Sequence, residues 1–272
     1  MLNTEKRNEK TTHIDEMTTA QMMQVMQEEN FNAVRAINDQ LPAIARAVDA
    51  VSERMKEGGR LFYVGCGTSG RLGVLDASEC PPTYGVSYDT VIGIMAGGAA
   101  ALSREGEADE DSFEDGCTDL MAYGVNEKDS VVGISVSGGA TYVLGALETA
   151  KKAGALPVAL SCNEGCPIEA LAEISIHPDT GAEVVTGSTR MKAGSAHKMI
   201  LNMISTGVMI KQGHVYENLM VNLQPSNKKL RDRMIRITCD ITGRSYEESL
   251  KLLESCGFQI REAIKKDKQS NE

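Results

Sequence analysis

The chain has 272 residues, of which 42% are hydrophobic and 24% charged, a composition typical of a folded globular protein. Its net charge of −10 and its aromatic content of 4% argue against nucleic-acid binding. No apolar run reaches the roughly 20 residues of a membrane span, the polar start is unlike a signal peptide, and the seven scattered cysteines contain no CxxC pair. We therefore expect a cytoplasmic protein with reduced thiols that binds neither nucleic acid nor membranes.

The first 58 residues form a predicted helical segment. Residues 1–28 are polar and rich in methionine, which indicates short helices that lie on another part of the molecule. From Val34 to Met55 apolar residues recur at spacings of three and four, which predicts one long helix that packs on the core. Pro42 falls inside this pattern, where it would kink the helix. The same apolar stripe is compatible with a subunit contact.

Residues 59–218 alternate between short apolar runs and helical patterns. This alternation predicts an α/β fold, with a parallel sheet of about five strands and helices on both faces. The expected strands are residues 60–64, 91–95, 130–135, 156–160 and 173–177. Helices are expected from about residue 71, from the acidic run 105–115, and over 142–153.

Every segment after residue 190 has a helical pattern. The expected helices cover residues 191–211, about 227–238, 246–255 and 258–265. The sequence therefore predicts three parts: an N-terminal helical segment (1–58), a sheet domain (59–218) and a C-terminal helical region (219–272).

Three turns rich in glycine and hydroxyl groups fall where open parallel sheets bind ligands, at the carboxyl ends of strands. They are residues 65–70, 135–141 and 186–195. The first turn reads GxGxxG, the pattern of a dinucleotide site, but that site needs a carboxylate at the end of the second strand. The second strand has none there, and Asp89 precedes it. We therefore reject a dinucleotide site.

The first two turns favour a compact phosphate monoester instead. Glycines let backbone N–H groups approach an anion, hydroxyls add donors, and the start of the next helix adds a favourable dipole. The alternative is an ordinary pair of tight turns capped by Ser and Thr, but two such turns in one sheet favour a phosphate site. The candidate ligands are Gly67, Thr68, Ser69, Ser135, Ser137 and Thr141.

One carboxylate has an unusual expected position. Glu79 lies just before Pro81 and Pro82, where the helix is predicted to end. A carboxylate at a helix C-terminus faces an unfavourable dipole, which suggests a functional role. The acidic residues 105–115 stay ambiguous, since such runs are usually solvated. The four histidines and the cysteines show no metal-ligand spacing, so we expect no metal.

Several strings in the chain resemble N-acetylmuramic acid 6-phosphate etherases. The most specific are DASECPPT in residues 65–83 and TGSTRMKAG in residues 181–194, and shorter ones occur at 4–8, 96–98, 137–139 and 218–221. The resemblance covers nearly the whole chain, although the C-terminal region looks shorter than in many members. It implies membership of the sugar isomerase (SIS) superfamily, whose flavodoxin-like sheet binds phosphosugars.

The resemblance also implies a reaction. The family cleaves the D-lactyl ether of N-acetylmuramic acid 6-phosphate and releases N-acetylglucosamine 6-phosphate and D-lactate, a step in recycling cell-wall amino sugars. A general base removes the C2 proton of the open-chain sugar, and a general acid protonates the departing C3 lactate. Water then adds at C3. Each proton transfer typically contributes about 10²–10⁴-fold, and the reaction requires no cofactor.

By this resemblance, Glu79 is the acid that assists lactate departure. Matching without gaps from residues 96–98 to 111–112 indicates Glu110 as the C2 base, and the unusual local spelling keeps Glu107 as an alternative. Because a general acid needs a raised pKa, we expect Glu79 to be more enclosed by apolar surface than Glu110.

The remaining site residues follow from the same resemblance. The turns at Thr68–Ser69 and 135–141 would hold the 6-phosphate, and the segment from Ser188 to Lys192 would close over the sugar or the lactyl carboxylate. Arg190 or Lys192 would balance that carboxylate, although each is equally compatible with a surface charge. SIS proteins commonly pair with sites near the subunit boundary, so we expect a homodimer.

Two other functions compete with the etherase. A non-catalytic phosphosugar-binding regulator would use the same motifs, but such regulators carry two SIS domains, and this chain has room for one. An aldose–ketose isomerase would move the C2 proton to C1 and would need no carboxylate for a leaving group. Release of D-lactate separates the three.

Overall fold

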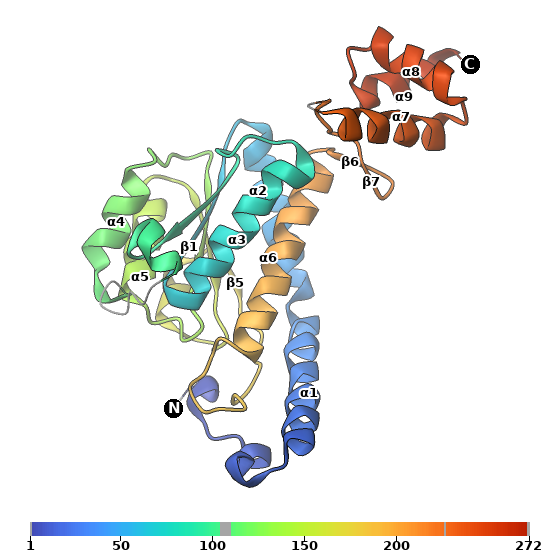
Figure 1. Cartoon of the computed structure of the whole chain (residues 1–272). Coiled ribbons are helices and arrows are strands. Elements are labelled where there is room, and N and C mark those ends of the chain that lie inside the picture. Colours follow the sequence, from blue (N-terminus) through green and yellow to red (C-terminus); the bar gives the residue numbers. More distant parts are fainter. Residues whose placement is uncertain (1, 104–109, 226, 271–272) are drawn as a thin grey trace. The chain divides into compact units, whose positions relative to one another are not determined.

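Figure 1 shows the computed structural model of the chain, which describes residues 2–103, 110–225 and 227–270. Contacts within the chain define two compact units. The first consists of residues 1–78 and 88–208, and the second of residues 79–87 and 209–272. No helix in the described part of the chain is both long enough and apolar enough to cross a membrane.

The first unit is built around a parallel sheet of five strands in the order β2-β1-β3-β4-β5. The strands are β1 (Leu61–Gly65), β2 (Val91–Met95), β3 (Ser130–Ile134), β4 (Leu156–Leu160) and β5 (Ile174–Ile176). All residues of β1, β3 and β4 are buried, as expected of a parallel sheet covered on both faces. The predicted α/β fold is confirmed, and each observed strand lies within one residue of its predicted bounds.

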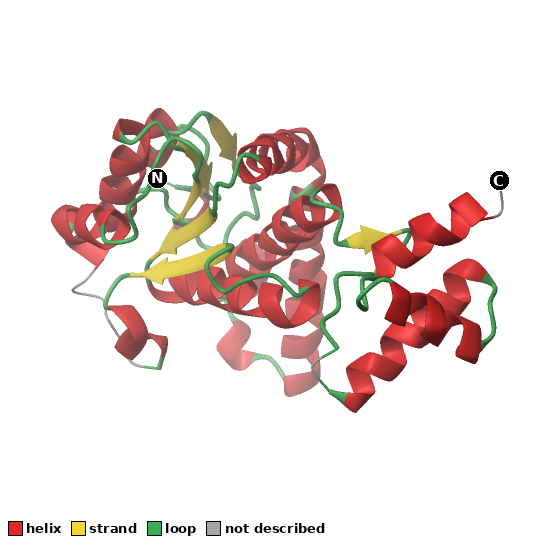
Figure 2. Ribbon diagram, turned by 90° about the horizontal axis from the view of Figure 1, so that it is seen from above, coloured by secondary structure: helices red, strands yellow, loops and turns green. Residues whose placement is uncertain are grey.

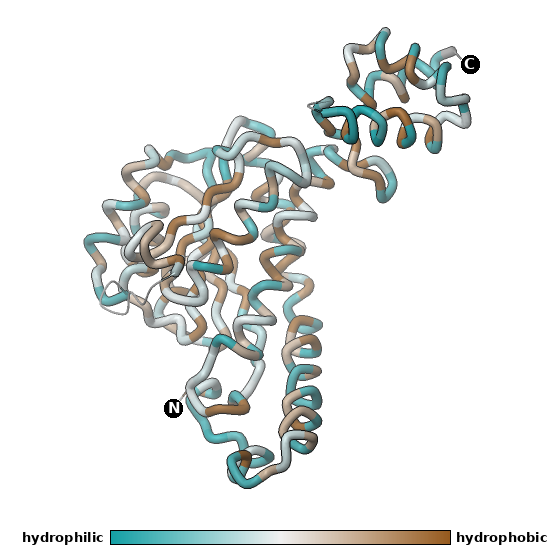
Figure 3. Tube along the Cα trace, in the orientation of Figure 1, coloured by the Kyte–Doolittle hydropathy of each residue, from teal (hydrophilic) through white to brown (hydrophobic). Residues whose placement is uncertain are grey.

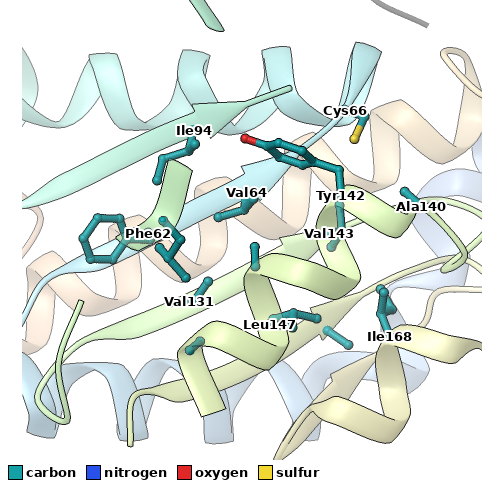
Figure 4. Close-up of a cluster of buried hydrophobic side chains, with 14 of the residues drawn as sticks. Phe62, Val64, Cys66, Ile94, Val131, Ala140, Tyr142, Val143, Leu147 and Ile168 are labelled. Carbon is teal, nitrogen blue, oxygen red and sulfur yellow. The ribbon is translucent and has the colours of Figure 1, made fainter. Parts of the chain in front are cut away.

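Helices cover both faces of this sheet (Figures 1 and 2). On one face α4 (Phe113–Met121) and α5 (Thr141–Lys152) pack together; on the other lie α2 (Leu41–Lys56), α3 (Gly67–Tyr84) and α6 (Lys192–Lys211). Phe62 and Val64 of β1 pack with Val143 and Leu147 of α5 in a buried apolar cluster (Figure 4). Tyr63 points the other way, and its hydroxyl donates to the carbonyl of Leu201 in α6.

The predicted long helix over 34–55 is wrong in one respect. The chain forms two helices, α1 (Thr19–Ala36) and α2, separated by a 3₁₀ turn at Asn38–Gln40. Pro42 lies in the first turn of α2, where its missing N–H group has no intrahelical partner to lose. Before α1 the chain makes three short 3₁₀ helices, η1 (Asn3–Glu5), η2 (Glu9–Thr11) and η3 (Ile14–Glu16).

Helix α3 also differs from its prediction. It begins inside the first turn, at Gly67 instead of about residue 71, and it continues through Pro81 and Pro82 to Tyr84. The expected end before the proline pair is therefore wrong. Both prolines fall in the last turn of the helix, so their missing N–H groups remove only the final bonds of the ladder, and Gly85 N–H closes the end by donating to the carbonyl of Pro81.

The second unit is a small helical bundle with a short hairpin. It contains α7 (Lys228–Thr242), α8 (Tyr246–Ser255), α9 (Ile260–Ser270) and the antiparallel pair β6 (Val215–Tyr216) and β7 (Leu219–Met220). Met234, Leu253 and Ala263 are fully buried in its core. Figure 3 shows polar and apolar residues alternating along these helices. The hairpin was not predicted, because two-residue strands are too short to show a period.

Candidate active site

A pocket of about 240 Å³ lies at the carboxyl ends of β1 and β3, which are level because Gly65 pairs with Ile134. This is the edge at which open parallel sheets bind ligands. Its lining comes from segments far apart in the sequence: Glu5, Cys66, Gly67, Thr68, Ser69, Glu110, Ile134, Ser135, Val136, Ser137, Ala140, Thr189 and Gly194.

The first turn forms one wall of the pocket as the start of α3. Gly70 N–H donates to the carbonyl of Cys66 at 3.0 Å, so the backbone turns tightly from β1 into the helix. A Cβ atom at Gly70 would lie 2.5 Å from the carbonyl oxygen of Gly65, and the turn therefore requires glycine there. The first N–H groups of a helix have no intrahelical partner, so Gly67, Thr68 and Ser69 present backbone donors and hydroxyls together.

The second turn forms the opposite wall. The hydroxyl oxygen of Ser135 accepts from Gly138 N–H at 3.1 Å, and that of Ser137 accepts from Gly139 N–H at 3.2 Å. The two hydroxyl oxygens are 3.5 Å apart. A hydroxyl that accepts still has one hydrogen to donate, so these bonds fix the positions of both oxygens and leave their hydrogens free to turn from each other toward an anion.

Thr141 does not line the pocket, unlike the other predicted phosphate ligands. Its hydroxyl donates to the backbone carbonyl of Glu110 at 3.2 Å. This bond ties the end of the acidic segment to the start of α5, and Glu110 itself lines the pocket. Glu107, the alternative base, lies outside the described residues.

Glu79 is placed differently from Glu110. It is exposed, it lies about three turns after Thr68 on the same helix, and it is not among the described residues that line the pocket. Glu110 is exposed as well. The expected apolar enclosure of Glu79 is therefore not found in the single chain.

The third turn contributes different residues from those predicted. Thr189 and Gly194 line the pocket, whereas Ser188 does not. Arg190 is exposed and lines an adjoining hollow of about 340 Å³, together with Lys198. Thr68 and Gly194 line both the hollow and the pocket, so a cationic surface borders the candidate site.

Lys192 has a contact that the sequence did not predict. Its side chain is 2% exposed, and its ammonium donates to Glu29 Oε2 at 2.6 Å. Lys10 and Asn8 also donate to Glu29. Burial would raise the pKa of Glu29, but the hydrogen bonds from Lys192, Lys10 and Asn8 and the charge of Lys192 together lower it to about 2. The ammonium of Lys192 is thus engaged in a buried ion pair instead of facing the pocket.

The chemistry of the lining is acidic and hydroxylic. No lysine or arginine is among the described residues that line the pocket, and its two charged groups are the carboxylates of Glu5 and Glu110. Anion binding there would rest on N–H and O–H donors, with a carboxylate beside the bound anion to move a proton. The sequence did not indicate Glu5 or Thr189 as site residues. Glu5 lies in the string TEKRN at residues 4–8, which resembles the family but indicates no role for this glutamate.

Solved structures share this fold. A phosphoheptose isomerase from Francisella tularensis has a TM-score of 0.54 at 18% identity, over 71% of this chain and all of that one. One from Neisseria gonorrhoeae has a TM-score of 0.54 at 16% identity, over 70% and 98%. A model described as the glucokinase regulatory protein N-terminal SIS domain matches residues 43–151. The fold, together with this match, is that of a SIS domain.

Relatives with higher sequence identity show to which family of SIS-domain proteins the chain belongs. Proteins named N-acetylmuramic acid 6-phosphate etherase are 50% identical in Clostridium beijerinckii, 51% in Bacillus pumilus and 47% in Salmonella agona. Each match covers at least 96% of this chain and at least 86% of the relative. The chain belongs to the N-acetylmuramic acid 6-phosphate etherase family, and the resemblance seen in the sequence is confirmed.

Proposed function

We propose that the protein is an N-acetylmuramic acid 6-phosphate etherase that releases D-lactate and N-acetylglucosamine 6-phosphate, and so recycles cell-wall amino sugars in the cytoplasm. One observation carries the proposal: two hydroxyl-rich turns and Glu110 line a single pocket at the strand ends. All seven cysteines are free thiols, which fits a reducing compartment. Residues 59–218 would be the phosphosugar-binding domain, flanked by the helical parts 1–58 and 219–272.

The 6-phosphate would bind between the first two turns. Gly67, Thr68 and Ser69 would donate from the start of α3, and Ser135 and Ser137 from the opposite wall. Backbone and hydroxyl donors with a helix dipole stabilise a phosphate without a cation. Thr141 would act indirectly, by holding the backbone of Glu110.

Glu110 would be the base that removes the C2 proton. Its place at the pocket puts a carboxylate beside the sugar carbons next to a phosphate held by the turns. The C1 aldehyde of the open-chain sugar stabilises the carbanion formed at C2, and the C3–O bond then breaks to leave an unsaturated aldehyde. Water adds to C3 in the second half of the reaction, and the C2 carbon regains its proton.

Glu79 would be the acid that protonates the departing lactate and then the base for the incoming water. Because Glu79 is exposed and is not among the described lining residues of its own chain, we infer that the protein is a homodimer in which Glu79 of one subunit reaches the pocket of the other. A paired surface would also remove water around Glu79, as a general acid requires.

Arg190 would balance the lactyl carboxylate. It lines the hollow that shares Thr68 and Gly194 with the pocket, and the turn from Ser188 would close over the sugar. The ammonium of Lys192 is bound to Glu29 and would not contact the sugar.

The deciding experiment is incubation with N-acetylmuramic acid 6-phosphate and enzymatic measurement of D-lactate. The wild type should release D-lactate stoichiometrically with N-acetylglucosamine 6-phosphate. In deuterated water, Glu79→Ala should still exchange the C2 proton but release no lactate, and Glu110→Gln should do neither. Loss of exchange in both variants would refute the division of roles.

A phosphosugar-binding regulator is the second candidate, since the matching SIS model carries the name of a regulatory protein. That function predicts that the wild type binds N-acetylglucosamine 6-phosphate in calorimetry but releases no D-lactate.

A further inference from the structure

The candidate pocket contains a second carboxylate besides that of Glu110. Glu5 ends the 3₁₀ helix η1 near the start of the chain, and it lines the pocket together with Thr68, Ser69, Ser135 and Ser137. A carboxylate is an unusual component of a pocket for an anion, because it repels the ligand's charge.

The segment that carries Glu5 is anchored to the second turn. The side-chain oxygen of Asn163 accepts from the backbone N–H of Asn3 at 3.1 Å. Its amide nitrogen donates to the hydroxyl of Thr4 at 3.2 Å and to the carbonyl of Val136 at 2.9 Å. Thr4 is fully buried. Asn163 therefore joins the residue before Glu5 to the residue between Ser135 and Ser137.

The third turn borders the same carboxylate. A Cβ atom at Gly187 would lie 3.7 Å from Glu5 Oε2, and Gly187 has a φ of +76°. The carboxylate of Glu5 thus lies close to the backbone of the turn from which Thr189 lines the pocket. The backbone before Glu5 is thus held by Asn163, and the exposed side chain of Glu5 lies beside the third turn at the rim of the pocket.

The chemistry of a carboxylate decides what it can bind. An ionised carboxylate only accepts hydrogen bonds, and so does a phosphate dianion, which means that the two repel each other. The neutral part of an amino-sugar phosphate has donors, namely its hydroxyl groups and its acetamido N–H. Only these groups can satisfy Glu5 in an occupied pocket.

We propose that Glu5 orients the substrate: it accepts a hydrogen bond from a hydroxyl or acetamido N–H of the sugar and repels the phosphate toward the N–H and hydroxyl donors of the first two turns. The sugar then enters in one direction, with its phosphate at the first two turns. This inference rests on the proposed function and adds a specificity residue to the same site.

The test compares Glu5→Ala and Glu5→Gln with the control Glu9→Gln, an exposed residue of the next 3₁₀ helix. Lactate release should give a KM raised about tenfold or more in Glu5→Ala, because a hydrogen bond to a charged group is lost, with kcat changed less than about threefold. Glu5→Gln, which keeps an acceptor oxygen, should lie between. Glu9→Gln should match the wild type.

Competitive inhibition by inorganic phosphate distinguishes a Glu5 that orients the sugar from a Glu5 that only shapes the phosphate-binding turns. Its inhibition constant should be unchanged or lower in Glu5→Ala, since only repulsion is removed. An unchanged KM, or phosphate inhibition weakened in step with KM, would overturn the proposal, because the second result means that Glu5 only shapes the phosphate turns. Thermal unfolding of Glu5→Gln within a few degrees of the wild type would show that the fold is kept.

The two proposals fail separately. If the wild type releases no lactate, the etherase function fails, and calorimetry with N-acetylglucosamine 6-phosphate still tests Glu5. Glu5→Ala should then bind that sugar phosphate about tenfold more weakly or worse. Equal binding would refute the role of Glu5 regardless of the reaction.

Discussion

At the residue scale, we expect the buried ion pair of Lys192 and Glu29 to contribute to stability and not to substrate binding. The side chains of Glu29 and Lys192 are 4% and 2% exposed, and removing one partner of such a pair leaves an uncompensated buried charge. We expect Lys192→Met to lower the free energy of unfolding by about 3 kcal/mol, measured by urea denaturation, with KM for the sugar unchanged at a temperature where the variant is folded.

Lys152→Met is the matched control, since Lys152 forms an exposed pair with Glu148 on α5. Exposed pairs contribute little, so this variant should unfold like the wild type. If Lys192→Met instead has wild-type stability and a raised KM, Lys192 binds the substrate and the prediction is wrong.

The burial of His197 leads us to expect that the stability of the protein depends on pH. It is fully buried, and burial lowers its pKa to about 4 despite the hydrogen bond to the carbonyl of Ser161. In the unfolded chain the pKa is about 6.5, so between these values the unfolded state binds a proton that the folded state does not. The free energy of unfolding should therefore fall as the pH drops from 7 to 4, by about 3 kcal/mol from this group.

The measurement is urea denaturation at pH 7, 5.5 and 4 for the wild type and for His197→Gln. The variant should lose the part of the pH dependence that His197 causes. His13→Gln changes an exposed histidine and should keep the wild-type slope. Parallel pH profiles for the wild type and His197→Gln would contradict this assignment.

At the scale of elements, the first turn depends on the close approach of β1 to the start of α3. In Gly70→Ala the new Cβ atom would meet the Gly65 carbonyl oxygen at 2.5 Å and the Met95 Cβ at 2.6 Å. We expect a loss of about 1–3 kcal/mol in the free energy of unfolding, with a larger KM because the donors at Thr68 and Ser69 shift. Gly139→Ala, whose Cβ would have its nearest neighbour at 3.7 Å, should keep wild-type stability in thermal unfolding.

The strands and helices also show which features a local sequence pattern can predict and which it cannot. The strands were predicted almost residue by residue, because a strand covered on both faces forms a short and mostly apolar run. The break between α1 and α2 was not, because the apolar stripe from Val34 to Met55 continues across it. Val34 and Leu41 on either side of the break are exposed, whereas Ile44 and Val51 are buried.

At the scale of the whole molecule, the proposed homodimer makes a quantitative prediction. Equal amounts of Glu79→Gln and Glu110→Gln subunits, unfolded together and refolded, should recover about a quarter of wild-type activity. Half of the dimers would then be mixed, and each mixed dimer would have one site with both glutamates intact. Each variant refolded alone should stay inactive. A mixture as inactive as its components would place both glutamates of a site in one chain, and a monomer in sedimentation equilibrium would exclude the dimer.

The sequence by itself determined the strands, the two hydroxyl-rich turns and the family, because apolar runs, glycine turns and long identical strings are local features. Only the tertiary structure decided that Glu5 lines the pocket and that Lys192 binds Glu29 instead of facing the pocket. The contacts responsible join residues about 160 positions apart, Thr4 to Asn163 and Glu29 to Lys192. No local pattern encodes such a pairing, because it depends on how the sheet and its helices bring the two ends of the first unit together.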